Sequence, residues 1–369
     1  MKSVKAFENL PSEFKRLVFY SEGAADWPHL GPIIERLVGL RGRPVTYLTS
    51  DPRDPGLSIE SPLLRGFQVG SGTARTILFA GIDCRHFVMT LPDLGMLWLK
   101  RSPRSVHYIY AFHSLNSTHT AYRTGAFDGF DTILCAGPHH VDEIRRTEEA
   151  YGLPTKQLIE HGSAKLDAVL AEFGGLRRVE EPSGLITALV APTWGESSLI
   201  EQPVGRDVIQ ELISGGIRTV LRLHPMTVRR LPELVSGLQA QFGGNSLFVL
   251  EDDMNANESW MRADVMISDW SGAAIEYAFG LLRPVIYIDT PPKIMNPDWQ
   301  KIGMPSFEST VRRQLGRIVD PSAVGTLSHV VHEVASDPVN HERVLSARSN
   351  AAFNVGRSSE AAVEYLAAL

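Results

Sequence analysis

Residues 265–278 read Val-Met-Ile-Ser-Asp-Trp-Ser-Gly-Ala-Ala-Ile-Glu-Tyr-Ala. They combine a short apolar strand, a polar turn and the beginning of a helix. Val265–Ser268 is too uniformly apolar for a strand with one solvent-exposed face. It is typical of a parallel strand that is buried on both faces. Ser271 is a good N-cap for a helix beginning at Gly272. This strand–turn–helix unit predicts an open α/β sheet.

The same unit recurs in both directions along the chain. The expected strands of the N-terminal half are Arg16–Tyr20, Pro44–Thr49, Thr76–Ala80, His86–Thr90, Val106–Ala111 and Thr132–Cys135. Those of the C-terminal half are Leu185–Val190, Thr219–Leu223, Leu247–Leu250, Val265–Ser268 and Pro284–Ile288. Helical patterns separate them, including Trp27–Leu40, Val228–Phe242 and Ser358–Leu369. We therefore expect two Rossmann-like α/β halves with helices at the C-terminus.

Length and a change of composition place the domains. A chain of 369 residues is long for one ordinary domain. A polar, glycine-bearing stretch at 172–184 separates the two series of strands. We expect an N-terminal domain at 1–175, a second at 176–345, and a helical segment at 346–369.

Composition narrows the class of partner. Hydrophobic residues make up 43% of the chain and charged residues 21%, which is ordinary for a globular protein. The net charge of −6 argues against a nucleic-acid partner, because phosphate backbones require a cationic surface. Cys84 and Cys135 lie in apolar runs and resemble small buried side chains in a reducing compartment. With no signal-like N-terminus and no run of ~18 apolar residues, we expect a cytoplasmic protein.

Polar residues gather at the ends of three predicted strands in the C-terminal half. The three clusters are Ala191–Trp194, Arg222–Pro225 and Ser268–Gly272. Because open α/β sheets bind ligands at the carboxyl ends of their strands, the clusters predict one site. Walker-type, GxGxxG and GxSxG motifs do not occur in the sequence, which disfavours ATPases, common dehydrogenases and α/β-hydrolases.

The turn before the Gly272 helix predicts an anion site. Ser271, Gly272 and Ala273 are small enough for a phosphate to approach the free N–H groups of the first helical turn. Glu276, one turn further on, is placed to accept hydrogen bonds from ribose hydroxyls. The plainer alternative is that Ser271 only caps the helix and Gly272 only relieves crowding.

The other two clusters supply cations and hydrogen-bond donors. Alternation puts Arg222 and His224 on the same side of their strand, where a guanidinium and an imidazolium could clamp a diphosphate. Thr193 can donate a hydrogen bond to phosphate, and Trp194 lies beside it. The alternatives are a surface arginine, a strand-end histidine and a buried tryptophan.

His113 is the candidate base of the N-terminal half. Seven of the twelve histidines lie between His86 and His161, but their spacing matches no zinc motif, so we expect no metal and no cofactor. Only His113 sits where a strand should meet the cleft between the halves, a position suited to a general base for a hydroxyl acceptor. A strand-end histidine without chemistry is the alternative.

Taken together, the motifs resemble the CDP-glycerol glycerophosphotransferases, which build teichoic-acid and capsule polymers. In that family Ala-Pro-Thr-Trp-like, Arg-x-His-Pro-like and Ser-Asp-Tyr-Ser-Ser segments follow one another in the C-terminal domain. Here they read APTW (191–194), RLHP (222–225) and SDWSG (268–272). Phe112-His113-Ser114 is similar to the family's Trp-His-Gly, in which the histidine is taken as the acceptor-side base. Tyrosine has become Trp270 and the second serine Gly272.

The resemblance implies a GT-B architecture, with two Rossmann-like domains facing across a cleft, and a CDP-linked polyol-phosphate donor on the C-terminal domain. It implies a diphosphate at Ser271, Gly272 and Ala273, with Ser268 beside them. The acceptor hydroxyl attacks the phosphorus next to the glycerol and CMP leaves. His113 takes the proton, and His224 neutralises the leaving phosphate. We expect Asp269 to orient the loop or His224.

Three other functions fit the same pattern. A GT-B sugar transferase would break a different bond of a nucleotide sugar, and a nucleotide-sugar 2-epimerase would need no acceptor. A non-catalytic binding module would hold the nucleotide without turnover. The acceptor is expected to be a polyol, a glycan or a lipid-linked chain. The stretch 96–104, apolar residues with Lys100, Arg101 and Arg104, predicts a peripheral contact with the inner face of the membrane.

Overall fold

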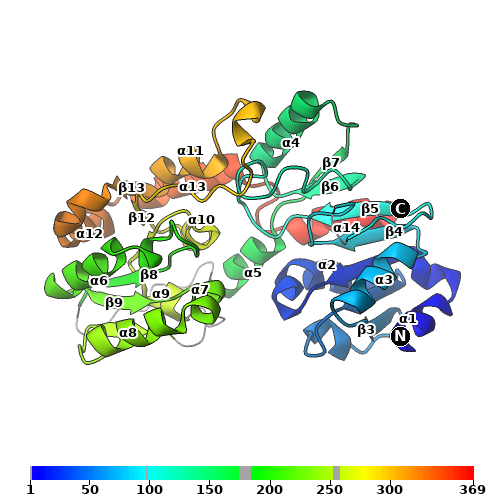
Figure 1. Cartoon of the computed structure of the whole chain (residues 1–369), viewed down its shortest axis with the longest axis horizontal. Helices are drawn as coiled ribbons and strands as arrows, with labels where there is room; N and C mark the ends of the chain where they lie inside the picture. Colours follow the sequence, from blue (N-terminus) through cyan, green and yellow to red (C-terminus); the bar gives the residue numbers. More distant parts are fainter. Residues whose placement is uncertain (1, 97–98, 174–183, 252–257) are drawn as a thin grey trace. The chain divides into compact units, whose positions relative to one another are not determined.

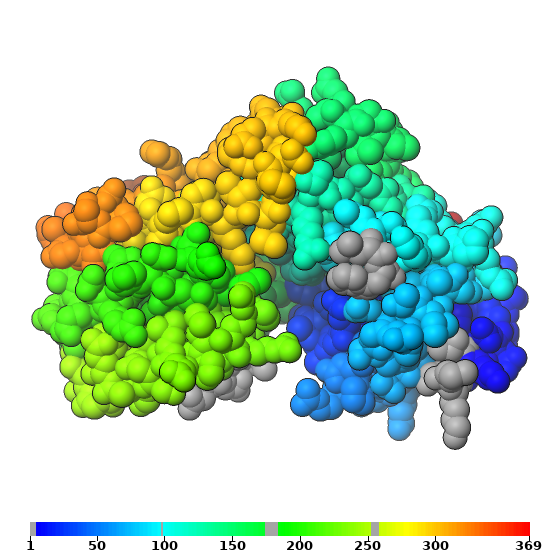
Figure 2. All heavy atoms as spheres, in the orientation of Figure 1, coloured from blue at the N-terminus to red at the C-terminus, as the bar shows by residue number. Residues whose placement is uncertain are grey.

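A computed structural model describes residues 2–96, 99–173, 184–251 and 258–369. The chain forms two compact units (Figure 1). The first comprises residues 1–168, 295–304 and 351–369, and the second comprises 169–294 and 305–350. The boundary expected near residue 176 falls at 174–183, outside the described residues. Figure 2 shows the surfaces of the units with the residues outside the description in grey.

The described residues of the first unit build a seven-stranded parallel sheet in the order β3-β2-β1-β4-β5-β6-β7. Its strands are β1 (Leu17–Ser21), β2 (Val45–Thr49), β3 (Leu64–Gln68), β4 (His86–Met89), β5 (His107–Ala111), β6 (Thr132–Cys135) and β7 (Gln157–Glu160). Its helices are α1 (Lys2–Glu8), α2 (Trp27–Gly39), α3 (Thr73–Gly81), α4 (Pro138–Tyr151), α5 (Ala164–Phe173, which continues into the second unit) and α14 (Ser358–Ala368). Short 3-10 helices lie at η1 (Ser12–Lys15), η2 (Ala24–Asp26), η3 (Pro55–Ser58) and η5 (Trp299–Ile302).

The core of the first unit explains why its C-terminal residues return to it. Leu30, Ile33 and Ile34 of α2 pack with Val363 and Leu366 of α14 against one face of the sheet. This apolar stripe is the face that a helix must bury to be stable. The C-terminal helix α14 is therefore part of the first unit's fold.

The described part of the second unit holds a six-stranded parallel sheet in the order β10-β9-β8-β11-β12-β13. The strands are β8 (Thr187–Val190), β9 (Arg218–Leu221), β10 (Phe248–Leu250), β11 (Val265–Ser268), β12 (Val285–Ile288) and β13 (Gly316–Val319). The helices are α6 (Val204–Ser214), α7 (Pro225–Arg230), α8 (Pro232–Phe242), α9 (Glu258–Arg262), α10 (Gly272–Leu281), α11 (Phe307–Leu315), α12 (Leu327–Ser336) and α13 (Asn340–Ala351), with η4 (Leu199–Glu201) and η6 (Pro321–Thr326). The strand order reverses between β8 and β11, and such a switch point is where open sheets bind ligands.

Two parallel sheets confirm the predicted α/β class, but two local predictions were wrong. Thr76–Ala80 belongs to helix α3, not to a strand, and only Leu78 and Phe79 of that helix are buried. A short apolar run cannot by itself separate the two periods. The single helix expected at 228–242 is two helices, because Leu231 leaves the helical conformation before Pro232.

Candidate active site

The candidate site of the second unit lies at the switch point of its sheet. Ser271 caps α10, and its hydroxyl accepts from the N–H of Ala273. Gly272 and Ala273 are half-buried, so the first turn of the helix is accessible. Glu276 is buried, with 5% of its surface exposed. The turn predicted to bind phosphate is a capped helix start at a parallel-sheet edge, a geometry that suits an anion.

Asp269 organises the loop beside this turn. Its carboxylate, which is wholly buried, accepts hydrogen bonds from the N–H groups of Thr193 (2.8 Å), Leu199 (2.8 Å) and Trp270 (2.7 Å). Burial raises the pKa of Asp269, and the three N–H donors oppose that rise. The carboxylate is surrounded by donors of its own loop, which are the contacts of an orienting group. Ser268 likewise ties the loop together, since its hydroxyl donates to the Ala191 carbonyl at 2.7 Å.

His224 is held as a neutral imidazole. It caps α7, with Nδ1 accepting from the N–H of Met226 at 3.0 Å. Burial, with Lys293 nearby, lowers the pKa of His224 to about 4. In this environment the neutral form carries its proton on Nε2, so His224 can donate a hydrogen bond to a phosphate. The imidazolium expected from the sequence is disfavoured by desolvation and by the neighbouring lysine.

Arg222 is engaged inside the protein. Its Nε donates to Glu251, and its terminal NH2 donates to the Ser259 hydroxyl at 2.7 Å. Its guanidinium also lies 5.9 Å from the centre of the Trp260 ring. The sequence suggested that Arg222 binds a diphosphate. A diphosphate would then have to compete with the Glu251 carboxylate for the Arg222 guanidinium.

Lys293 is a cation of the candidate site that was not predicted from the sequence. Its ammonium lies 3.5 Å from the centre of the Trp194 ring, and the His224 ring lies 5.9 Å from the same indole. Arg230 is also over Trp194, at 5.5 Å. Burial lowers the pKa of Lys293 to about 8 against the attraction of Asp269 and Glu201. Its place shortly after β12, at the end of a strand, was the signal in the sequence that could have identified it.

A second buried cation, Arg312 of α11, was also missed. Its guanidinium lies 4.0 Å from the Trp270 ring centre and pairs with Asp289 at 3.0 Å. The Trp270 indole N–H donates to the Thr290 carbonyl at 2.7 Å. Stacking and this hydrogen bond fix the indole beside the phosphate turn, which explains why an aromatic residue occupies that position.

In the first unit, His113 follows β5 and is half-buried. Its Nδ1 lies 3.3 Å from the Tyr110 hydroxyl. In the tautomer in which Nδ1 donates to that oxygen, Nε2 holds the lone pair that a base requires. Burial raises the pKa of Tyr110, so its hydroxyl stays protonated.

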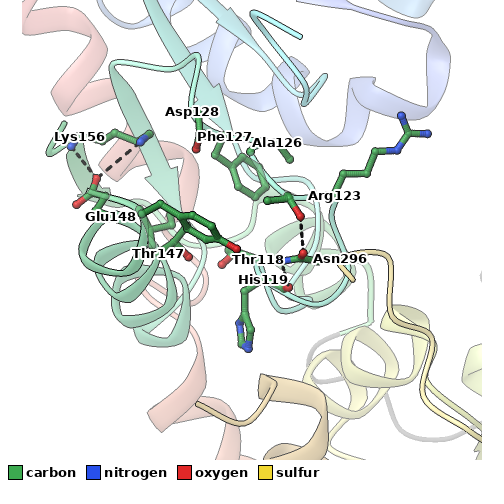
Figure 3. A pocket seen from close by; sticks show the side chains of 14 residues that line it. Thr118, His119, Arg123, Ala126, Phe127, Asp128, Thr147, Glu148, Lys156 and Asn296 are labelled. Atoms are coloured by element: carbon green, nitrogen blue, oxygen red, sulfur yellow. Dashed lines mark hydrogen bonds and ion pairs between the residues drawn. The ribbon is translucent and has the colours of Figure 1, made fainter. Parts of the chain in front are cut away.

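A small pocket lies on the loop that follows His113 (Figure 3). Its cavity of about 30 Å³ has room for only a water or two. Asn296 closes one side, donating to the His119 carbonyl at 3.0 Å and accepting from Thr124 at 2.5 Å. These hydrogen bonds of Asn296 hold the segment 295–304 against the rest of the first unit. The pocket itself is too small for a polyol.

The expected membrane-facing stretch is only partly described. Residues 97 and 98 lie outside the described residues, and Leu99 is buried. Arg101 pairs with Asp131 at 2.9 Å, and Arg104 pairs with Asp83 at 2.8 Å. These two cations are engaged with carboxylates of the protein. Among the described residues, no helix has the length and apolar character needed to cross a membrane.

Comparison with known proteins gives the site a context. Residues 128–291 match the model of the CDP-glycerol:poly(glycerophosphate) glycerophosphotransferase family. The structure resembles the wall teichoic acid polymerase TagF, with a TM-score of 0.60 and 14% identity over 99% of this chain and 92% of the other. It also resembles a putative UDP-N-acetylglucosamine 2-epimerase from Listeria monocytogenes, with a TM-score of 0.62 and 12% identity over 94% of both chains. No curated protein sequence matches significantly.

These likenesses confirm the GT-B-like fold, and the family match covers all three motifs of the second unit. The resemblance on which the sequence analysis depended is confirmed with it. The match over residues 128–291 and the likeness to TagF together support a CDP-glycerol glycerophosphotransferase-like enzyme with a GT-B-like fold.

Proposed function

We propose that the chain transfers glycerol phosphate, or a related polyol phosphate, from a CDP-linked donor to a hydroxyl acceptor in cell-surface polymer synthesis. The observation that carries the proposal is the gathering of the three family motifs at the switch point of the second sheet. There the helix α10 starts with its N-terminal N–H groups, of which that of Ala273 donates to the Ser271 hydroxyl, and Lys293 and the His224 ring lie near the Trp194 indole. These are the groups that a diphosphate requires.

In the proposed reaction the acceptor oxygen forms a bond to the phosphorus that carries the glycerol. The bond from that phosphorus to the oxygen bridging the two phosphates breaks, and CMP leaves. His113 takes the acceptor proton. His224 donates a hydrogen bond to the departing phosphate through Nε2, while Lys293 offsets its charge. The acceptor is a polyol, a glycan or a lipid-linked chain, and a lipid-linked acceptor would bring the enzyme to the membrane surface.

The released nucleotide tests the proposal. The protein is incubated with CDP-glycerol, and in parallel with UDP- and GDP-linked sugars, in the presence and absence of a glycerol phosphate acceptor. We expect CMP only from CDP-glycerol, and only with an acceptor. Release of UDP or GDP would establish a sugar transferase instead. Epimerised donor formed without any acceptor would establish an epimerase, whose fold this chain shares.

A further inference from the structure

Three histidines extend one face of the first unit's sheet beyond its carboxyl edge. Ala111 of β5 and Ile159 of β7 pack on the face that α2 covers. Since alternate residues of a strand point to the same face, His113 and His161 continue that face past the ends of their strands. His29 lies in the first turn of α2, and its ring is 5.9 Å from that of His113. We call His29, His113 and His161 the histidine cluster.

Two members of the histidine cluster are buried with ring nitrogens unsatisfied. His161 is 1% exposed, and neither of its nitrogens has a hydrogen-bond partner among the described residues. His29 is 7% exposed, and within the described part of the chain its Nδ1 has none. A buried polar atom without a partner destabilises the fold, so such atoms call for a ligand that supplies the missing bonds.

The charge around the histidine cluster selects the kind of ligand. Burial lowers the pKa of His29 most, and His113, Lys165 (at the start of α5) and His161 lower it further. Among the described residues, no group of histidines, cysteines and carboxylates has a geometry that could hold a metal ion. An anion would be attracted where a cation would be repelled.

We propose that His29, His161 and Lys165 bind the phosphodiester anion adjoining the acceptor's hydroxyl. The inference rests on the proposed function, because a polymer built from glycerol phosphate units carries such an anion next to each terminal hydroxyl. Binding the anion here brings that hydroxyl to His113. The three residues are binding residues, and none of them takes part in bond making or breaking.

Anion binding by the histidine cluster should also change the protonation of its histidines, and this change can be measured. In the free protein burial lowers the pKa of His161 to about 4, so its imidazole is neutral at pH 7. A bound anion favours the protonated form and raises the pKa of the histidines that contact it. Binding at neutral pH should therefore take up protons from the buffer.

Titration calorimetry of the full chain tests the inference without any donor. The probes are glycerol 3-phosphate, inorganic phosphate and uncharged glycerol, each in buffers of different ionisation enthalpy. We expect both anions to bind with proton uptake and glycerol to show no measurable binding. Tighter binding of glycerol 3-phosphate than of phosphate would identify the polyol ester as the ligand. Equal binding would identify free phosphate as the ligand and overturn the acceptor assignment.

The variants His161→Phe and His29→Phe keep a ring and remove the donors. We expect each to weaken glycerol 3-phosphate binding by roughly tenfold or more, the usual cost of losing a hydrogen bond to a charged group. Because His161→Phe also removes unsatisfied buried nitrogens, its melting temperature should not fall below that of the wild type. The matched control is His86→Phe, a buried histidine at the amino end of β4 in the same sheet.

The outcomes separate this inference from the proposed function. Unchanged anion binding in both cluster variants, or no binding and no proton uptake by the wild type, would overturn the anion site. Proton uptake is measured on the wild type, so the test remains decisive even if a variant does not fold. Anion binding without CMP release from CDP-glycerol would leave the binding site standing and remove the transfer reaction.

Discussion

The proposed function gives Asp269, Lys293 and His113 three different tasks, and each proposed task follows from what surrounds the side chain. Asp269 is enclosed by backbone donors, Lys293 lies over the Trp194 indole, and His113 is half-buried at a strand end. Under the proposed function, Asp269 shapes the site, whereas Lys293 and His113 touch the substrate. Each can be tested by a substitution that changes one property.

Replacing Asp269 by Asn should destabilise the second unit. An amide offers one acceptor oxygen. Its NH2 group would face a backbone N–H group whose hydrogen bond the carboxylate now accepts. We expect a loss of about 1–3 kcal/mol in the free energy of unfolding, measured by urea denaturation. Asp207→Asn, at an exposed position of α6, is the control. Equal stability of the two variants would contradict the orienting role.

Lys293 should make donor binding depend on pH. With a pKa of about 8 in the free protein, its ammonium is charged below that pH and neutral above it. Affinity for CDP should therefore be highest below about pH 7.5 and fall by up to roughly tenfold per pH unit above pH 8. Lys293→Gln should bind CDP weakly at every pH. The charge control is Arg229→Gln on the exposed side of α7, and a flat profile for the wild type would exclude Lys293 from the site.

Replacing His113 by Ala should lower turnover by about 10²–10⁴-fold, the range for removal of a general base. Affinity for the donor should change little, because the donor-binding groups belong to the second unit. Tyr110→Phe removes only the hydroxyl beside Nδ1 and should cost less. Steady-state rates and calorimetric titration of CDP separate the two effects. Loss of donor binding with turnover intact at saturation would reverse the assignment.

At the scale of elements, the start of α10 is the feature on which the proposed donor site depends. A helix of this length combines unpaired N–H groups with the positive end of its dipole. The small residues at Ser271, Gly272 and Ala273 leave those N–H groups approachable. The N–H of Ala273 donates to the Ser271 hydroxyl and the N–H of Ala274 donates to the Ser271 carbonyl at 3.2 Å, so we expect a bound anion to share these donors.

Gly272→Val should crowd a diphosphate at this helix start while the fold survives. A β-branched residue costs the helix less than ~1 kcal/mol in propensity, so the melting temperature should change little. CDP affinity should fall by at least tenfold, as roughly expected for losing charge-assisted bonds. Gly237→Val in the middle of α8, where nothing crowds an added Cβ within 3.7 Å, is the matched control. Unchanged CDP affinity would leave only the capping role.

At the scale of the whole molecule, the chain leaves the second unit and returns to the first twice. Residues 295–304 and 351–369 both belong to the first unit. The last helix contributes Ala362, Val363 and Leu366 to the first unit's core. The stability of the first unit therefore depends on residues at the end of the chain.

Leu366→Ala should destabilise the first unit selectively. The side chain is fully buried, and removing it leaves a cavity that costs about 2–5 kcal/mol. Hydrogen exchange measured by mass spectrometry should show faster exchange in β1, β2 and α2, with β8 and β11 unchanged. Leu345→Ala, at a position of α13 that is 38% exposed, is the control. Equal loss of protection in both units would show that they unfold together.

The sequence by itself determined the α/β class, the two series of strands and the place of the three motifs at strand ends. Continuous apolar runs, glycine and serine at helix starts and the order of the motifs are local properties. Edge strands such as β3 and β7 were missed because their burial is partial and their apolar signal weak. The helix α3 was mistaken for a strand because its apolar run is too short to show a period.

Only the tertiary structure decided which charges the site can use. Arg222 and Lys293 are both cations near strand ends, but Glu251 holds the first, whereas the second is left over Trp194. His29 meets His113 although 84 positions separate them along the chain, because α2 packs across the sheet. Such pairings depend on side chains that distant segments bring together, and on the burial that follows. A local pattern in the sequence contains neither the distant partners of a side chain nor its burial, so the contacts of each motif's side chains had to come from the tertiary structure.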